Sequence, residues 1–162
     1  MVISKHSGIY SFRTEQFLPI SVDEAWHFFS TPSNLQKLTP KELDFRITSP
    51  RLEKIHPGQI VTYSIKIFPL FRSQWVTEIT VVEDKKFFID EQRYGPYKMW
   101  HHKHSFTEVD GGVLMSDEVY LKLPFPLLAP LAYRLYIKKK LNAIFEFRHK
   151  HLEKMIEQGD LK

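Results

Sequence analysis

The sequence of 162 residues contains no cysteine and only six glycines. The lack of cysteine excludes disulfides, zinc sites built from thiolates and cysteine nucleophiles. No glycine-rich loop is present that could cradle a phosphate, and no serine or threonine lies in a nucleophile-elbow pattern. The chain therefore carries none of the motifs that mark nucleotide-binding proteins or serine hydrolases.

Long hydrophobic runs are also missing. No apolar run approaches the roughly 18 residues of a membrane span, and residues 1–12 lack the apolar core of a signal peptide. With the absence of cysteine, this pattern leads us to expect a cytoplasmic protein. The 43% hydrophobic content suits a chain that buries about 70% of its unfolded surface, and we expect residues 1–162 to form a single domain.

The charge is moderately basic, with a formal net charge of +4. Much of the excess lies near the C-terminus, in Lys138, Lys139, Lys140, Arg148 and Lys150. No recognised nucleic-acid motif accompanies these residues. We interpret them as the solvated face of a helix and expect no nucleic-acid partner.

Residues 127–158 are predicted to form one long helix. Pro130 lies near its start and Gly159 follows its end, where a left-handed cap is typical. About 30 residues give a rod of roughly 45 Å, which suits a position across a sheet. Apolar residues recur at steps of three and four and predict a buried stripe of Leu131, Leu135, Leu141, Ile144, Phe145, Leu152 and Met155.

The preceding chain is predicted to supply that sheet. Residues 8–18 alternate as a first strand, and Ser21 to Glu24 form a capping box that begins a short helix. A second short helix should run from Thr31-Pro32 to Thr39-Pro40. Residues 43–123 then change to a period of two, interrupted by turn signals, which predicts six further strands. They are expected over about 43–47, 61–67, 75–81, 87–94, 98–109 and 113–123.

This order of elements predicts an α+β fold of the helix-grip type. Seven antiparallel strands should form a curved sheet around the C-terminal helix, because connections this short cannot join parallel neighbours. The two short helices lie between the first and second of these strands.

Several motifs along nearly the whole chain support a family resemblance. They are Leu18-Pro19-Ile20, Trp26-x-Phe28-Phe29, Pro32-x-Asn34-Leu35-x-x-Leu38-Thr39-Pro40, Gly95-Pro96-Tyr97-x-x-Trp100-His101-His102-x-His104-x-Phe106, Asp117-x-Val119-Tyr120 and Ile144-Phe145-x-x-Arg148. Together they resemble the SRPBCC, or START-like, superfamily, in particular a bacterial ligand-binding branch loosely labelled cell-division-inhibitor-like, whose members sometimes sit beside an epimerase domain. The resemblance implies a hydrophobic cavity between sheet and final helix that binds lipids, polyketides or other apolar molecules. Catalysis occurs in only some branches of that superfamily.

The histidine-rich stretch 100–106 has the most unusual local composition. Alternation along a strand places Trp100, His102, His104 and Phe106 on one face, and we expect this face to point inward. If Asp110-Gly111 is a two-residue hairpin loop, the register places His104 directly opposite Asp117. Asp90 and Gln92 join the group if the turn at residues 95–97 has three residues.

Four interpretations of this polar group remain open. The histidines could form a structural network satisfied by Asp117 and Gln92, or the same groups could orient a largely apolar ligand. A catalytic pair would use His104 as general base, oriented by Asp117. A metal site of His102, His104 and Asp117 has suitable donors, but two histidines on one strand form no specific signature, so we expect neither metal nor cofactor.

Aromatic and other apolar residues are expected to complete the site. Arg148 falls near the buried stripe of the helix, where it should pair with an acidic strand residue or contact an anionic ligand group. The predicted ligand-binding residues are Tyr63, Trp75, Asp90, Gln92, Trp100, His102, His104, Phe106, Met115, Asp117, Phe145 and Arg148. Taken singly, each aromatic residue is more typical of an ordinary core position than of a ligand site.

Two loops are apolar where turns are normally polar, over residues 68–71 and 124–128. They could pack against the long helix, or form the rim of a ligand entrance that touches a partner or transiently a membrane surface. The adjacent Lys138 to Lys140 could attract anionic headgroups.

From the sequence we therefore expect a domain that binds a small hydrophobic ligand without catalysis. Two alternatives are an enzyme of the cyclase or dehydratase type that uses His104 and Asp117, and a protein-interaction module whose cavity is vestigial. No ligand, partner or oligomeric state follows from the sequence.

Overall fold

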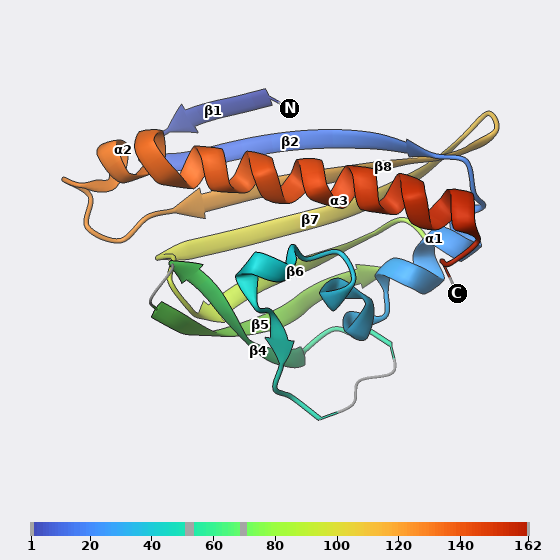
Figure 1. Ribbon diagram of the computed structural model, residues 1–162, viewed down its shortest axis with the longest axis horizontal. Helices are drawn as coiled ribbons and strands as arrows, with labels where there is room; N and C mark the ends of the chain where they lie inside the picture. Colours follow the sequence, from blue (N-terminus) through green and yellow to red (C-terminus); the bar gives the residue numbers. More distant parts are fainter. Residues whose placement is uncertain (1, 51–53, 69–70, 162) are drawn as a thin grey trace.

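The computed structural model describes residues 2–50, 54–68 and 71–161, and places their strands in one antiparallel sheet (Figure 1). The order across the sheet is β1-β2-β8-β7-β6-β5-β4-β3. The strands are β1 (Val2–His6), β2 (Ile9–Leu18), β3 (Arg46–Ile47), β4 (Gln59–Phe68), β5 (Phe71–Glu83), β6 (Phe87–Tyr94), β7 (Met99–Val109) and β8 (Gly112–Lys122). The helical elements are α1 (Val22–Phe29), the 3₁₀ turns η1 (Pro32–Gln36) and η2 (Lys41–Leu43), α2 (Ala129–Ala132), the π-helical segment η3 (Tyr133–Ile137) and α3 (Lys138–Gln158).

The sheet bends around α3, with β2, β8 and β7 behind the helix and β4 and β5 turned below it (Figure 1). From β3 onward each strand pairs with the next along the chain, and β8 then pairs with β2. This is a helix-grip fold, as predicted. Buried residues form three groups, one under α1, one where η3 and α3 cross β2 and β8, and one on β4 and β5.

The sheet has eight strands rather than the seven expected. The seven predicted strands correspond to β2 through β8, and β1 is the addition, pairing with β2 along the edge of the sheet. Five residues are too few for alternation to separate a strand from an irregular segment.

The first helix begins as the capping box predicts. The Ser21 hydroxyl accepts from the Glu24 N–H at 3.2 Å, and the Glu24 carboxylate accepts from the Ser21 N–H at 2.9 Å. The second short helix is replaced by the two turns η1 and η2, with Leu38 buried between them. Thr39 donates its hydroxyl to the Leu35 carbonyl at 2.7 Å, a local bond that competes with regular helix.

The long C-terminal helix spans residues 129–158 and ends where predicted, with Gly159 in the left-handed conformation at φ 72°. The predicted burial of Leu131 and Leu135 is wrong, since they are 59% and 66% exposed. The π-helical segment is wound more widely than an α-helix, which shifts the phase of the turns on either side. Tyr133, stacked on Tyr10 at 3.7 Å between ring centroids, occupies the sheet side instead.

Candidate functional site

Two glycines fix the register of the β7–β8 hairpin. Gly111 adopts φ 78°, and a Cβ on Gly112 would lie 2.2 Å from the carbonyl oxygen of Leu18. Val109 therefore pairs with Gly112, and His104 lies directly opposite Asp117, as predicted. The inward face of β7 carries His102, His104 and Phe106, all buried, as the strand alternation indicates.

The β6–β7 connection brings in a second carboxylate. Pairing of these strands places Asp90 opposite His102. The prediction that Gln92 would join the histidines is wrong, because its side chain holds the turn. Its amide donates to the Tyr97 carbonyl at 2.6 Å and its oxygen accepts from the Tyr97 N–H at 3.3 Å.

Asp117 lies at the centre of the polar group and is 3% exposed. Its Oδ1 atom is 2.8 Å from Nε2 of His102, with which it shares a hydrogen bond. The same oxygen lies 2.9 Å from Nδ1 of His104, an ion-pair contact whose direction is too poor for a hydrogen bond. Arg148 on α3 donates from Nη1 to this oxygen at 3.5 Å, which confirms the predicted pairing of Arg148 with an acidic strand residue.

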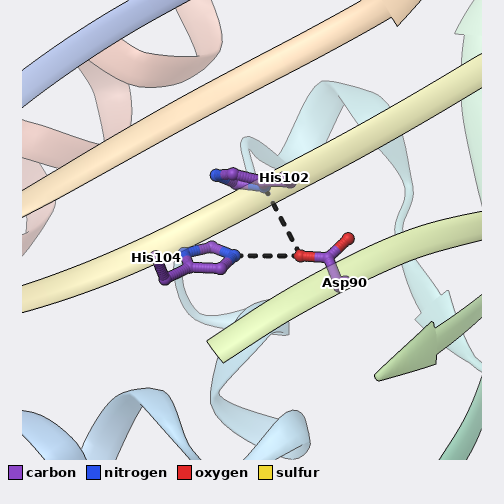
Figure 2. A group of neighbouring side chains, drawn as sticks. All are labelled: Asp90, His102 and His104. Carbon is purple, nitrogen blue, oxygen red and sulfur yellow. Dashed lines mark hydrogen bonds and ion pairs between the residues drawn. The ribbon is translucent and has the colours of Figure 1, made fainter. Parts of the chain in front are cut away.

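Asp90 contacts the two imidazoles from the other side (Figure 2). Its Oδ2 atom lies 2.9 Å from Nε2 of His104, in a hydrogen bond, and 3.5 Å from Nδ1 of His102. The two imidazole rings lie 3.7 Å apart between centroids, and Phe88 stacks on His104 at 4.3 Å. Each histidine is thus held between Asp90 and Asp117.

The two carboxylates remain ionised in this setting. Burial raises the pKa of Asp117, but the charge of Arg148, the hydrogen bond with His102 and the contact with His104 hold it well below its ordinary value. Burial also raises the pKa of Asp90, and the hydrogen bond from His104 with the nearby positive charges lowers it overall. Two negative charges are therefore buried beside the guanidinium.

The pKa values of the two histidines are shifted in opposite directions. Burial and the charge of His104 lower the pKa of His102, outweighing its bond to Asp117. Burial also lowers the pKa of His104, but its contacts with Asp117 and Asp90 raise it overall. His104 is therefore the more readily protonated of the two imidazoles, and Arg148 supplies a fixed positive charge beside the carboxylates.

Asp90, His102 and His104 offer one ligand atom each within 4.8 Å of one another, the type of set that binds a divalent cation. This set contains Asp90 in place of the Asp117 considered from the sequence. A divalent cation would have to displace contacts that are already made, because Asp90 shares a hydrogen bond with His104, and Asp117 accepts from Arg148 and shares a hydrogen bond with His102. The ion-pair network accounts for these residues without a metal.

A cavity of about 200 Å³ lies between the sheet and α3, and most of the polar group lines it. Eight of the predicted site residues line it: Tyr63, Trp75, Asp90, Trp100, His102, His104, Phe145 and Arg148. Asp117 lies behind the histidines and does not reach the cavity wall. Phe106 and Met115 pack instead into the core under α1 with Trp26 and Phe29, so the prediction that they line the cavity is wrong.

Sequence reasoning missed several lining residues. Thr77 is buried and shares a hydrogen bond of 3.0 Å with the Tyr63 hydroxyl. It alternates with Trp75 and Ile79 on β5, a signal that could have identified it. Tyr97 also lines the cavity, with its ring 5.1 Å from that of Trp100.

Comparison with known proteins gives relatives in structure only. No protein-family model matches the chain, and no curated protein matches its sequence. The chain is similar to TTHA0849 from Thermus thermophilus, with 16% identity, a TM-score of 0.66, and coverage of 92% of this chain and 98% of that one. It is also similar to Ara h 8.0201, a Bet v 1 allergen, with 13% identity, a TM-score of 0.60, and coverage of 91% and 99%.

A third similar structure is named as a nucleoside-diphosphate sugar epimerase from Corynebacterium glutamicum. The identity is 21% and the TM-score 0.66, and the match covers 90% of this chain but 29% of that longer one. At these identities the comparisons establish the fold, and function has to be argued from the site.

Proposed function

We propose that the chain binds a small hydrophobic ligand, such as a lipid or polyketide-like molecule, in the cavity between the sheet and α3, and that it does so without catalysis. This is the role implied by its resemblance to the SRPBCC superfamily and its bacterial ligand-binding branch. The match to one segment of an epimerase-named protein agrees with that branch. Similarity to a Bet v 1 allergen supports the same type of fold.

The wall of the cavity is the observation that carries the proposal. Aromatic rings of Tyr63, Trp75, Trp100 and Phe145 line it, and Asp90, His102, His104 and Arg148 stand among a small number of polar lining residues. Ligand sites combine such an apolar wall with a few fixed polar groups that orient the ligand. The volume of about 200 Å³ lies below the ~300–1,000 Å³ of typical sites, so the ligand should be small or the cavity should widen on binding.

Native mass spectrometry of the chain purified from the organism that encodes it tests the proposal directly. A bound ligand would appear as added mass that is lost under denaturing conditions. Separately, an apolar fluorescent probe should change the emission of Trp75 and Trp100, and fatty acids or aromatic polyketide-like compounds should displace it. A protein mass without ligand, with no probe binding across a broad apolar library, would contradict the proposal and favour an interaction module with a vestigial cavity.

A matched pair of variants on α3 locates the binding. Ile144 lines the cavity, whereas its neighbour Ala143 is exposed. Ile144→Trp should fill the cavity and weaken probe binding at least tenfold, and Ala143→Trp should leave it within about twofold, provided both variants retain the native circular dichroism spectrum. Equal affinities in the two variants would place the probe elsewhere.

An enzyme of the cyclase or dehydratase type is the second candidate. The observation that favours it is the position of His104 at the cavity wall, where contacts with Asp117 and Asp90 raise its pKa and so favour the protonated form that a general acid needs. For this candidate, His104→Ala should abolish turnover of a bound compound while its binding survives. Binding without any turnover in the unaltered protein would exclude it for that compound.

A further inference from the structure

Five large apolar side chains are exposed on the segment that leads from β8 into η3. They are Phe125, Leu127, Leu128, Leu131 and Leu135, and Leu127 and Phe125 are 95% and 73% exposed. We call this group the apolar tip. It belongs to α2, η3 and the loop before α2, at the end of the molecule opposite the C-terminus (Figure 1). A contiguous apolar group in solvent marks a surface that another phase or partner covers.

Local structure holds these residues outward. Phe125 adopts φ 57°, a left-handed conformation that is unfavourable for a bulky residue. Tyr133 and Ile137 of η3 are buried against the sheet, so the positions that face inward are already filled. Leu131 and Leu135 could turn inward only if these two side chains left the core.

The charged residues on the segment that carries the apolar tip are all basic. Residues 119–145 contain no aspartate or glutamate, and Arg134, Lys138 and Lys139 are exposed beside the leucines. An apolar face flanked by lysine and arginine is typical of a helix that lies in the interface of an anionic bilayer. Within the described residues no helix is long and apolar enough to cross a membrane, so any contact with a bilayer made by these helices would be peripheral.

The apolar tip adjoins one end of the cavity. The Tyr136 hydroxyl in η3 donates to the Ile67 carbonyl, which joins the helix to β4. Ile67, Lys140 and Leu141 all line the cavity. The expectation for the loop 68–71 concerns residues that lie largely outside the described part, although Phe71 is 71% exposed.

We propose that the apolar tip inserts into an anionic lipid surface, with Arg134, Lys138 and Lys139 against the headgroups, and that this contact brings the end of the cavity to the bilayer. The role given to this contact, delivery of a ligand, rests on the proposed function of the cavity. A ligand that dissolves in the bilayer would then pass between membrane and cavity without crossing water.

Flotation with lipid vesicles tests the contact. The chain should bind phosphatidylcholine vesicles that contain about 30% phosphatidylserine at least tenfold better than pure phosphatidylcholine, and salt should weaken the binding. Leu127→Glu with Leu131→Glu should lower the vesicle-bound fraction at least tenfold. Val109→Glu is the control, an exposed apolar residue at the β7–β8 hairpin, and it should change binding less than about twofold.

A second pair of variants tests the charges. Lys138→Glu with Lys139→Glu should weaken binding at least tenfold, whereas Lys150→Glu with Lys154→Glu, exposed residues farther along α3, should have a smaller effect. Equal binding by the tip variants and the unaltered chain would overturn the proposal. So would a dimer in light scattering that the leucine variants dissociate, since the apolar tip would then be a contact between copies.

Two separate measurements distinguish a failure of the membrane proposal from a failure of the cavity proposal. Vesicle binding is measured without ligand, and probe binding in the cavity is measured without vesicles. If the chain takes up the probe but ignores vesicles, the membrane proposal fails alone. If it binds vesicles but no apolar probe, the cavity proposal fails alone.

Discussion

Replacing Asp117 by asparagine should destabilise the fold strongly, because it removes one of two buried negative charges without changing the size of the side chain. The buried Arg148 guanidinium would then lose the carboxylate that it contacts, and the histidines would keep only Asp90 as a charged acceptor. Breaking a buried ion pair from one side costs about 3–5 kcal/mol. We expect about 3 kcal/mol, the low end of that range, because the asparagine keeps the shape of the side chain and its oxygen can still accept a hydrogen bond.

Urea denaturation followed by circular dichroism measures the effect. With a slope near 2 kcal/mol/M, the midpoint of Asp117→Asn should fall by about 1.5 M. Glu118→Gln on the same strand is the control, since Glu118 is only half-buried and accepts from the Tyr120 hydroxyl at 2.7 Å. It should change stability by less than about 0.5 kcal/mol. Equal midpoints for the two variants would refute the argument that Asp117 belongs to a buried ion-pair network.

Three further predictions concern the same strands. The pKa of His104 is raised above 6.5 by folding, so its stabilisation is present below that pH and lost as the pH rises through the folded value. The free energy of unfolding should therefore fall as the pH rises above about 6.5, and His104→Gln should remove that slope; parallel slopes would show that His104 is not held by the carboxylates. His101→Ala, on the outer face, should cost less than about 0.5 kcal/mol in urea denaturation, and a larger loss than in His102→Ala would mean reversed strand faces. Adding zinc or a chelator should leave the melting temperature within about 1 °C, whereas a rise of several degrees with zinc would show that Asp90 and the histidines take a cation.

Where local geometry decides, the sequence was a good guide. The turn Asp110-Gly111 set a register that carried His104 to a position opposite Asp117, and strand alternation separated His101 from His102. Periods of two, capping signals and turn residues act over a few positions, so they can be read without knowing the rest of the fold.

Where distant parts of the chain compete, the sequence was a poor guide. Gln92 shares a strand face with Asp90, yet its side-chain amide donates a hydrogen bond to the Tyr97 carbonyl. Its side chain therefore does not contact the histidines. Leu131 has the period of a buried residue, but Tyr133 stacks on Tyr10 and occupies the side that faces the sheet. The π-helical segment η3 changes which residues of the helix face that side. Alternation indicates which side chains point inward, and it does not tell whether they reach the cavity or the core beside it, as with Phe106.

The polar cluster of Asp90, His102, His104, Asp117 and Arg148 contributes to stability and also forms part of the cavity wall. A substitution within it therefore changes folding and ligand contact together. Asp90, His102 and His104 each contact a charged partner and also line the cavity. Loss of ligand binding in such a variant could follow from a disturbed network as well as from a missing contact. The apolar wall lacks this double role, because Ile144 makes no ion pair and a tryptophan there fills space without removing a charge. A loss of binding in Ile144→Trp with an unchanged unfolding midpoint would therefore locate the ligand, and only then can the contribution of His102 or His104 to recognition be separated from their contribution to folding.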